Sequence, residues 1–182
     1  MRYIFIGMKH CGKSSHGKLF AEKRNLPFFD TDDLVEELYA AKLSKKGNCR
    51  EIFNEHGAEF FAELEKEILA KLLSEEKFYN CVIAMGGRMP VAPDLQNELK
   101  KLGCYVYIKV ADNVIFERIK RRGFPSFVDQ QNPYESVCKL IRDREVFYDN
   151  LATITINVED LPKNVVANKI AKEIEEFENN VR

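Results

Sequence analysis

The chain has 182 residues, 45% of them hydrophobic, which is enough for one domain with a full core and leaves little room for a second. Lys and Arg number 28 against 29 Asp and Glu, so no overall charge favours nucleic acid or a membrane surface, and we expect neither partner. The five cysteines are widely spaced without a C-x-x-C pair, which is typical of reduced thiols. No leader-like segment is visible, and no run approaches the ~20 apolar residues of a membrane span. We therefore expect a cytoplasmic, monomeric protein with a single domain over residues 1–182.

Short apolar runs alternate with longer helical patterns along the chain. Runs that are apolar on both faces and separated by helices predict a parallel sheet covered on both sides. The sequence therefore predicts an α/β fold with three layers. The predicted strands cover residues 3–6, 27–29, 81–85, 104–110 and 154–158.

The first predicted strand leads into a loop at residues 7–14 with the spacing G-x-x-x-x-G-K-S/T. Between a strand and a helix this spacing is typical of a phosphate-binding loop, because its backbone N–H groups turn inward and the helix N-terminus adds partial positive charge. Lys13 would reach the β- and γ-phosphates of a nucleotide, and the Ser14 hydroxyl would bind Mg²⁺. The alternative is an ordinary strand-to-helix turn that is followed by Lys and Ser by chance.

Three aspartates, Asp30, Asp32 and Asp33, follow the second predicted strand. Carboxylates at the C-terminal end of a parallel strand point into the crevice where ligands bind, here beside the phosphate-binding loop. Asp30 can hold a Mg²⁺-bound water, and Asp32 can accept a proton or a hydrogen bond from a substrate hydroxyl. The alternative is a helix N-cap with first-turn charges. We assign that role to Asp33 and favour a functional role for Asp30 and Asp32.

Residues 49–73 show a helical pattern with one break at Gly57. Phe61, Leu64, Ile68 and Leu72 form one continuous apolar stripe, which predicts core packing rather than a cofactor site. Two helices inserted between the second and third strands would cover a small substrate.

Later stretches carry further candidate binding groups. Gly86 and Gly87 follow the third strand, where their N–H groups can bind an anion or simply form a turn. Basic residues 120–122 end a helix and precede a polar loop, which is consistent with a lid over the phosphates or with a solvated helix end. Arg144 lies on the apolar face of the next helix, so it must meet an anion, either a substrate group or a structural Asp or Glu.

In the order and spacing of these motifs the chain resembles shikimate kinases over nearly its full length. Besides the phosphate-binding loop, the matching residues are Asp30-Thr31-Asp32, the pattern Ile52-Phe53…Gly57…Phe61…Glu65, Gly86-Gly87, the lid region and Arg144…Tyr148. The resemblance implies a three-layer P-loop kinase fold with a five-stranded parallel sheet, a helical substrate-binding insertion at residues 31–62 and a lid at residues 120–133. It also implies that ATP and Mg²⁺ are used to phosphorylate a hydroxyl of shikimate.

The resemblance assigns roles to individual residues. Asp32 would bind the substrate hydroxyls, Arg144 would bind the substrate carboxylate, and Arg118 and Pro162 would flank adenine. The expected catalytic residues are Lys13, Asp32 and Arg121, and the expected metal ligands are Ser14 and Asp30. The expected nucleotide contacts are Gly7, Lys9, Cys11, Gly12, Lys13, Ser14, Ser15, Arg118 and Pro162. The expected substrate contacts are Asp32, Gly86, Gly87, Arg88 and Arg144.

Three positions depart from the family pattern. Ala62 stands where the family usually has an arginine for the substrate carboxylate, Arg88 where it usually has a third glycine, and Phe124 where an arginine precedes the lid proline. Arg88 can supply the cation missing at position 62, and Arg121 or Arg122 can supply the lid cation. The departures leave two alternatives open: a kinase for another small hydroxylated acid or sugar, and a nucleotide-binding regulatory module without catalysis.

Overall fold

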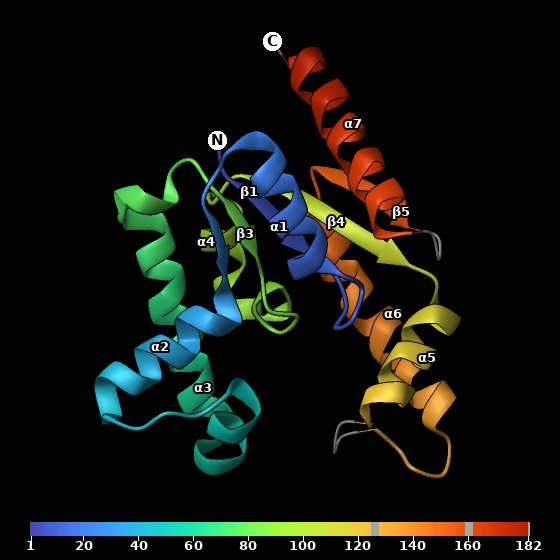
Figure 1. Ribbon diagram of the computed structural model, residues 1–182. Helices are drawn as coiled ribbons and strands as arrows, with labels where there is room; N and C mark the ends of the chain where they lie inside the picture. Colours follow the sequence, from blue (N-terminus) through green and yellow to red (C-terminus); the bar gives the residue numbers. More distant parts are fainter. Residues whose placement is uncertain (125–127, 159–161, 182) are drawn as a thin grey trace.

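The computed structural model describes residues 1–124, 128–158 and 162–181. At its centre is a parallel sheet of five strands in the order β2-β3-β1-β4-β5, with helices on both faces (Figure 1). The predicted three-layer α/β fold with a five-stranded parallel sheet is confirmed. The strands are β1 (Tyr3–Ile6), β2 (Phe28–Asp30), β3 (Val82–Ala84), β4 (Cys104–Val110) and β5 (Ile154–Val158).

β1 lies in the middle of the sheet because it is apolar on both faces and pairs along both edges, with β3 and with β4. Ile4, Phe5 and Ile6 are completely buried. Burial of side chains of this size stabilises the fold by about 1.5–3 kcal/mol each. The loop that follows β1 therefore starts from a firmly held position.

β2 begins one residue later than expected and reaches Asp30. Pro27 has no N–H to donate to the ladder, although its carbonyl accepts a hydrogen bond from the N–H of Val82 (2.9 Å). As a result Asp30 is the last residue of the strand, and Asp32 lies in the first turn of the helix that follows. β3 is one residue shorter at each end than the predicted run at residues 81–85.

The remaining helices cover the sheet. α1 (Lys13–Arg24) and α7 (Lys163–Val181) pack against each other, while α6 (Pro133–Leu151) packs against β4 and against α5 (Asp112–Arg122). None of the helices in the described part of the chain is long and apolar enough to cross a membrane. The short elements around β3 are η1 (Glu76–Phe78), η2 (Met89–Val91), η3 (Pro93–Leu95) and α4 (Gln96–Leu99).

α2 (Thr31–Leu43) and α3 (Cys49–Ser74) stand between β2 and β3 and pack against each other. The predicted break at Gly57 is confirmed, because its φ of 82° and ψ of −175° kink α3. The apolar stripe from Phe61 to Leu72 is buried, as expected for core packing. α3 runs without a further break through residue 62, so the boundary of the substrate-binding insertion at that residue stays a prediction.

Figure 1 shows α2 with the start of α3 on one side of the carboxyl end of the sheet and α5 on the other. The predicted lid, residues 120–133, runs from the last turn of α5 to the first residue of α6. Its residues 125–127 are outside the described part of the chain.

Candidate active site

The phosphate-binding loop connects β1 to α1. Gly12 is the N-cap of α1 and has a φ of 104°, a conformation that side chains rarely adopt. The Lys13 ammonium lies over the loop, where it donates hydrogen bonds to the carbonyls of Gly7 (3.0 Å) and Met8 (3.1 Å). Cys11 is buried, so this expected nucleotide contact can involve only its main chain, whereas Lys9 and Ser15 are exposed.

Ser14 and Asp30 lie next to each other at the ends of α1 and β2. The Ser14 hydroxyl donates to Asp30 Oδ2 (2.6 Å), and Asp30 Oδ1 accepts from the backbone N–H of Asp32 (3.1 Å) as the N-cap of α2. Asp30 is therefore both the cap of α2 and the partner of the Ser14 hydroxyl. Oδ1 makes the helix-cap contact and Oδ2 contacts the expected metal ligand Ser14, so the structure is compatible with both roles considered from the sequence.

The described residues contain no group of three or more His, Cys, Asp or Glu side chains that could hold a metal ion. Mg²⁺ in phosphate-transferring sites is commonly held by one or two protein oxygens together with water and substrate phosphates. The Ser14–Asp30 pair beside the loop fits that smaller set of ligands.

Asp32 is solvent-accessible but surrounded by protein at the carboxyl end of the sheet. Desolvation raises the pKa of its carboxyl group, and the charge of Asp30 raises it further, whereas Lys13 and Lys9 lower it. The opposing effect of Lys13 places this carboxylate within electrostatic reach of the phosphate-binding loop. A pKa above the ordinary value makes Asp32 a stronger proton acceptor once it is ionised.

Gly86 contributes space rather than a free donor. A Cβ at this position would lie 2.4 Å from Asp32 Oδ1, so any larger residue would displace that carboxylate from its present position. Its N–H donates to the Thr31 hydroxyl (2.7 Å), which favours the turn over the anion-binding alternative for this N–H. Gly87 accepts hydrogen bonds at its carbonyl from Tyr148 (3.0 Å) and, at longer distance, from Arg144 (3.4 Å).

Arg144 is half-buried on α6 and points toward the loop after β3. Within the described part of the chain it forms no ion pair, and its acceptor is the Gly87 carbonyl at 3.4 Å, a weak hydrogen bond. A guanidinium that is partly desolvated without a carboxylate partner favours an anionic ligand. Of the two partners considered from sequence, the geometry supports a substrate anion.

A second arginine faces the same region from the loop after β3. Arg88 Nε lies 3.8 Å from Glu65 Oε2, and its guanidinium lies 5.0 Å from the ring centroid of Phe53 and 6.0 Å from that of Phe61. Ala62 is exposed on α3, one turn before Glu65. The structure therefore places the Arg88 cation beside the helix face that carries Ala62.

Sequence reasoning did not single out Glu65 as a site residue. Its side chain is only 6% exposed, and burial raises the pKa of its carboxyl to about 7, against the opposing charge of Arg88. Asp32 and Asp94 raise this pKa, and Arg144 lowers it, so Glu65 lies among the acceptor-side groups. The signal in the sequence was a glutamate four residues after Phe61, on the buried face of an amphipathic helix.

The phosphate-binding loop also contacts α5. Arg118 donates to the carbonyl of His10 in the phosphate-binding loop (3.1 Å). Burial lowers the pKa of His10 to about 4, and the nearby charges of Lys9, Arg122, Lys13 and Arg118 lower it as well.

Arg121 is not among these neighbours of the loop. It lines a hollow of about 430 Å³ with Phe116, Arg118 and Tyr134, whereas Arg122 is among the charges that lower the pKa of His10. Phe124 packs against Phe116, with ring centroids 5.8 Å apart. Pro162 is exposed immediately before α7.

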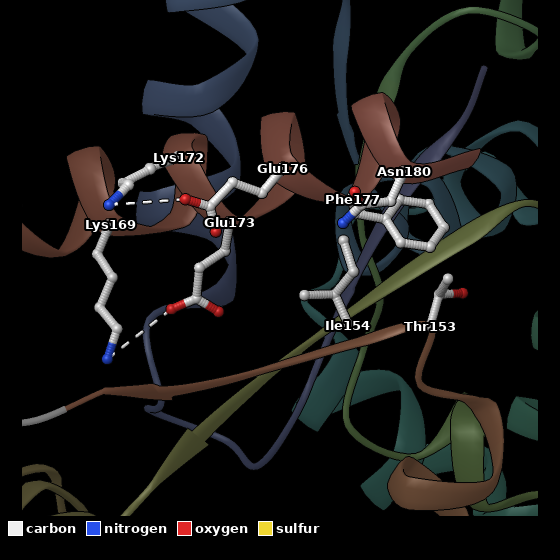
Figure 2. Close-up of a pocket in the computed structure, with 8 residues that line it drawn as sticks. All are labelled: Thr153, Ile154, Lys169, Lys172, Glu173, Glu176, Phe177 and Asn180. Carbon is white, nitrogen blue, oxygen red and sulfur yellow. Dashed lines mark ion pairs between the residues drawn. The ribbon is translucent and has the colours of Figure 1, made fainter. Parts of the chain in front are cut away.

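A wider groove of about 590 Å³ lies elsewhere, between β5 and α7 (Figure 2). Its charged side chains are paired with one another, Lys169 with Glu173 (3.9 Å) and Lys172 with Glu176 (3.6 Å). No predicted site residue lines it. The candidate site is therefore the region around the phosphate-binding loop.

Comparison with known proteins agrees with this geometry. The sequence matches the family described as shikimate kinase over residues 9–175. The chain belongs to the shikimate kinase family. A shikimate kinase from Thermodesulfovibrio yellowstonii is 34% identical over 176 residues, which cover 97% of this chain and 96% of the relative.

Solved shikimate kinases share the fold. The Aquifex aeolicus structure is 27% identical with a TM-score of 0.75, and the match covers 96% of each chain. The Acinetobacter baumannii structure, a complex with shikimate, is 23% identical with a TM-score of 0.82 and a match that covers 97% of this chain and 93% of that one. The predicted membership of the shikimate kinase family is thus confirmed.

Proposed function

We propose that this protein is an ATP-dependent kinase that transfers the γ-phosphate of ATP to a hydroxyl of shikimate. The observation that carries the proposal is the meeting of two sets of groups at the carboxyl end of the sheet. The first set, Lys13, Ser14 and Asp30, is suited to a nucleotide and its metal. The second set, Asp32 and Arg144, is suited to the acceptor.

Nucleotide and metal would be held by the phosphate-binding loop and its neighbours. ATP supplies the transferable phosphoryl group, and Mg²⁺ neutralises part of its charge. Lys13 would exchange its bonds to the loop carbonyls for phosphate oxygens, and Ser14 with Asp30 would hold the metal. Arg118, which donates to the His10 carbonyl in the loop, would meet the nucleoside together with Pro162.

The acceptor would bind between α2, α3 and the loop after β3. Asp32 would orient the attacking hydroxyl and accept its proton, a role favoured by its raised pKa. Arg144 would bind the acceptor carboxylate. Gly86 and Gly87 have no side chains and would leave space for the acceptor beside the backbone. Positioning and charge neutralisation, rather than covalent catalysis, account for the rate enhancement in this mechanism.

The lid cation is assigned here to Arg122 rather than to the initially expected Arg121. Arg122 is one of the charges that lower the pKa of His10 in the phosphate-binding loop, while Arg121 lines the hollow beside Tyr134. A cation close to the loop can neutralise charge on the transferring phosphate. The assignment places Arg122 one turn after Arg118 on the same helix.

The test is a coupled assay of ADP release with shikimate as acceptor. We expect saturable release that depends on shikimate, and we expect Lys13→Ala to lower turnover by roughly 100-fold or more because it removes the main phosphate cation. The matched control is Lys18→Ala, which removes an exposed lysine from the same helix and should leave turnover unchanged.

Three outcomes would contradict the proposal. Turnover with another hydroxylated acid or sugar but not with shikimate would show a different acceptor. ADP or ATP binding without turnover on any acceptor would instead favour a nucleotide-binding regulatory module. Unchanged turnover in Lys13→Ala would remove the loop from the mechanism altogether.

A further inference from the structure

One side chain of the phosphate-binding loop has no role in the mechanism described above. His10 stands two residues before Gly12, and its φ of 68° is left-handed, a conformation that is uncommon outside glycine. A glycine would adopt it without strain. Backbone strain of this kind is found mainly at binding and catalytic sites. The loop therefore keeps an imidazole at position 10 at a cost to its stability.

The His10 side chain is open to a ligand that fills the loop. It is partly exposed to solvent. Its carbonyl accepts the hydrogen bond from Arg118 (3.1 Å), which holds the backbone of residue 10 against α5. Within the described part of the chain, neither ring nitrogen of His10 forms a hydrogen bond. The imidazole thus offers one donor and one acceptor to a bound molecule.

The charges that act on this imidazole most strongly are all positive. Lys9 and Lys13 belong to the loop and the start of α1, and Arg118 and Arg122 belong to α5. Burial lowers the pKa of His10 to about 4, and these four charges add to the effect, so the ring is neutral in the free protein at neutral pH. A polar ring set among four cations on a phosphate-binding loop lies where an anion would bind.

Two of these cations place the ring at the phosphate end of a bound nucleotide. Arg122 and Lys13 act on the imidazole more strongly than Arg118 does, although Arg118 is bonded to the carbonyl of the same residue. Lys13 is the expected partner of the β- and γ-phosphates, and Arg122 is the proposed lid cation. The terminal phosphate is therefore the part of the nucleotide that comes nearest to His10. Its negative charge would oppose the effect of the cations and favour the protonated ring.

We propose that His10 is a phosphate-contacting residue, whose imidazole takes up a proton from solvent and donates a hydrogen bond to the terminal phosphate of the bound nucleotide. Because the contact is charge-assisted, it stabilises negative charge on the phosphate that is transferred. It supplies a cation that the chain lacks at Phe124, where the family pattern has an arginine. The inference rests on the proposed function only in taking ATP as the donor, and it gives a role to a side chain that the loop motif leaves unspecified.

A spectroscopic test follows the protonation of His10 directly. The chain has three histidines, so labelling with ¹⁵N-histidine gives few signals, and those of His10 are identified by their loss in His10→Asn. At about pH 5 the free ring should be neutral, and the Mg²⁺ complex of AMP-PNP, a non-hydrolysable ATP analogue, should convert it to imidazolium. In a titration the pKa of His10 should rise from about 4 to roughly 6. AMP, which lacks the β- and γ-phosphates, should leave it unchanged.

His56 provides an internal control for this measurement. It lies on α3, where its ring is hydrogen-bonded to the Tyr39 hydroxyl (3.0 Å). Its signals should not change when AMP-PNP binds. An unchanged His10 ring at saturating AMP-PNP, or an equal change with AMP, would overturn the proposal.

A binding test uses two variants that remove the ring and keep the loop. His10→Gly relieves the left-handed backbone, and His10→Asn has a shorter, uncharged side chain that tolerates this conformation. Calorimetry should give a Kd for Mg²⁺-AMP-PNP about tenfold higher in both variants, with the Kd for AMP unchanged. Without ligand, the Tm of His10→Gly should exceed that of wild type by about 2–4 °C, because the backbone strain is gone.

The possible outcomes separate the role of the ring from that of the loop. Wild-type affinity in His10→Asn with weaker binding in His10→Gly would mean that only loop flexibility matters, and wild-type affinity in both would mean that the ring makes no contact. Either result would overturn the proposal. These measurements do not require turnover, so a failed shikimate assay would contradict the proposed acceptor and leave this inference standing. Failure of the wild type to bind AMP-PNP would overturn both.

Discussion

Glu65 shows how one residue can link the core to the acceptor site. It belongs to the buried face of α3, yet its carboxylate lies 3.8 Å from Arg88, and the charges of Asp32 and Arg144 shift its pKa. Burial of a carboxyl group favours its neutral form, and the Arg88 contact at 3.8 Å is too long to cancel that effect. The outcome is a pKa of about 7, close to neutral pH.

This raised pKa predicts a pH-dependent stability. The unfolded carboxyl has a pKa of 4.5 and the folded one about 7, so between these values the folded protein holds a proton that the unfolded chain has lost. The free energy of unfolding should therefore fall as pH rises through that window, by up to about 3 kcal/mol from this group. Urea unfolding at several pH values should show Glu65→Gln gaining stability relative to wild type as pH increases.

The exposed Glu59 on the same helix provides the matched control. Glu59→Gln should change stability by nearly the same small amount at every pH. A constant difference between Glu65→Gln and wild type across this pH range would contradict the buried-carboxyl account.

Residue types and spacing predicted which residues lie near the phosphate-binding loop better than they predicted the hydrogen bonds that these residues form. The sequence predicted Asp30 beside the phosphate-binding loop because parallel strands end at the same edge of a sheet, and the Ser14 hydroxyl donates to Asp30. The sequence left open whether the Gly86 N–H binds an anion or belongs to a turn, because its pairing with the Thr31 hydroxyl depends on the register between β2 and β3. That register is a tertiary property that no local pattern encodes.

At the scale of elements, Arg88 would add a cation to the acceptor site from a loop, in addition to Arg144 from helix α6. Position 62 on α3 carries alanine, and the loop after β3 brings Arg88 to the same helix face, held over the rings of Phe53 and Phe61. Residues 62 and 65 are three apart on a helix and are therefore neighbours. An arginine at position 62 would reach the Glu65 carboxylate that Arg88 now meets.

This arrangement predicts an exchange experiment. Arg88→Ala should raise the KM for shikimate by roughly 10-fold to 100-fold, the range expected for one charge-assisted hydrogen bond, with the KM for ATP unchanged. The double variant Ala62→Arg with Arg88→Ala should recover most of that loss, because the cation returns from α3. Steady-state kinetics with each substrate varied in turn would measure both effects.

The carboxylate can be tested from the ligand side as well. With the methyl ester of shikimate, which lacks the negative charge, Arg88→Ala should change the KM little. A full effect on the ester, or an unchanged KM for shikimate in Arg88→Ala, would assign Arg88 a purely structural role in joining the loop to α3.

The elements themselves were largely predictable, and their arrangement was less so. Apolar runs located all five strands within about two residues, and the break at Gly57 matched a real kink. The position of β3 between β2 and β1 does not follow from periodicity, because it depends on which strands pair. This order places the carboxyl end of β3 between those of β1 and β2, so the loop after β3 begins between the phosphate-binding loop and the start of α2.

At the scale of the whole molecule, ligands are expected to join parts that contact each other little. The phosphate-binding loop is anchored at the centre of the sheet, while α2 and α3 pack mainly against each other beside β2, and α5 stands on the opposite side (Figure 1). A nucleotide would bridge the loop and α5, and an acceptor would bridge α6 and the insertion. Ligand binding should therefore stabilise the fold as a whole.

ADP at about 100 times its Kd should raise the free energy of unfolding by about 2.7 kcal/mol. For a protein of this size that corresponds to an increase in Tm of about 5–10 °C, measured by calorimetry or dye fluorescence. Lys13→Ala should show a much smaller increase at the same ADP concentration, because the ammonium that now lies on the Gly7 and Met8 carbonyls is absent. Lys18→Ala, with the loop intact, should match wild type. An equal Tm increase in all three proteins would mean that ADP binds away from the phosphate-binding loop, and the link between this loop and global stability would fail.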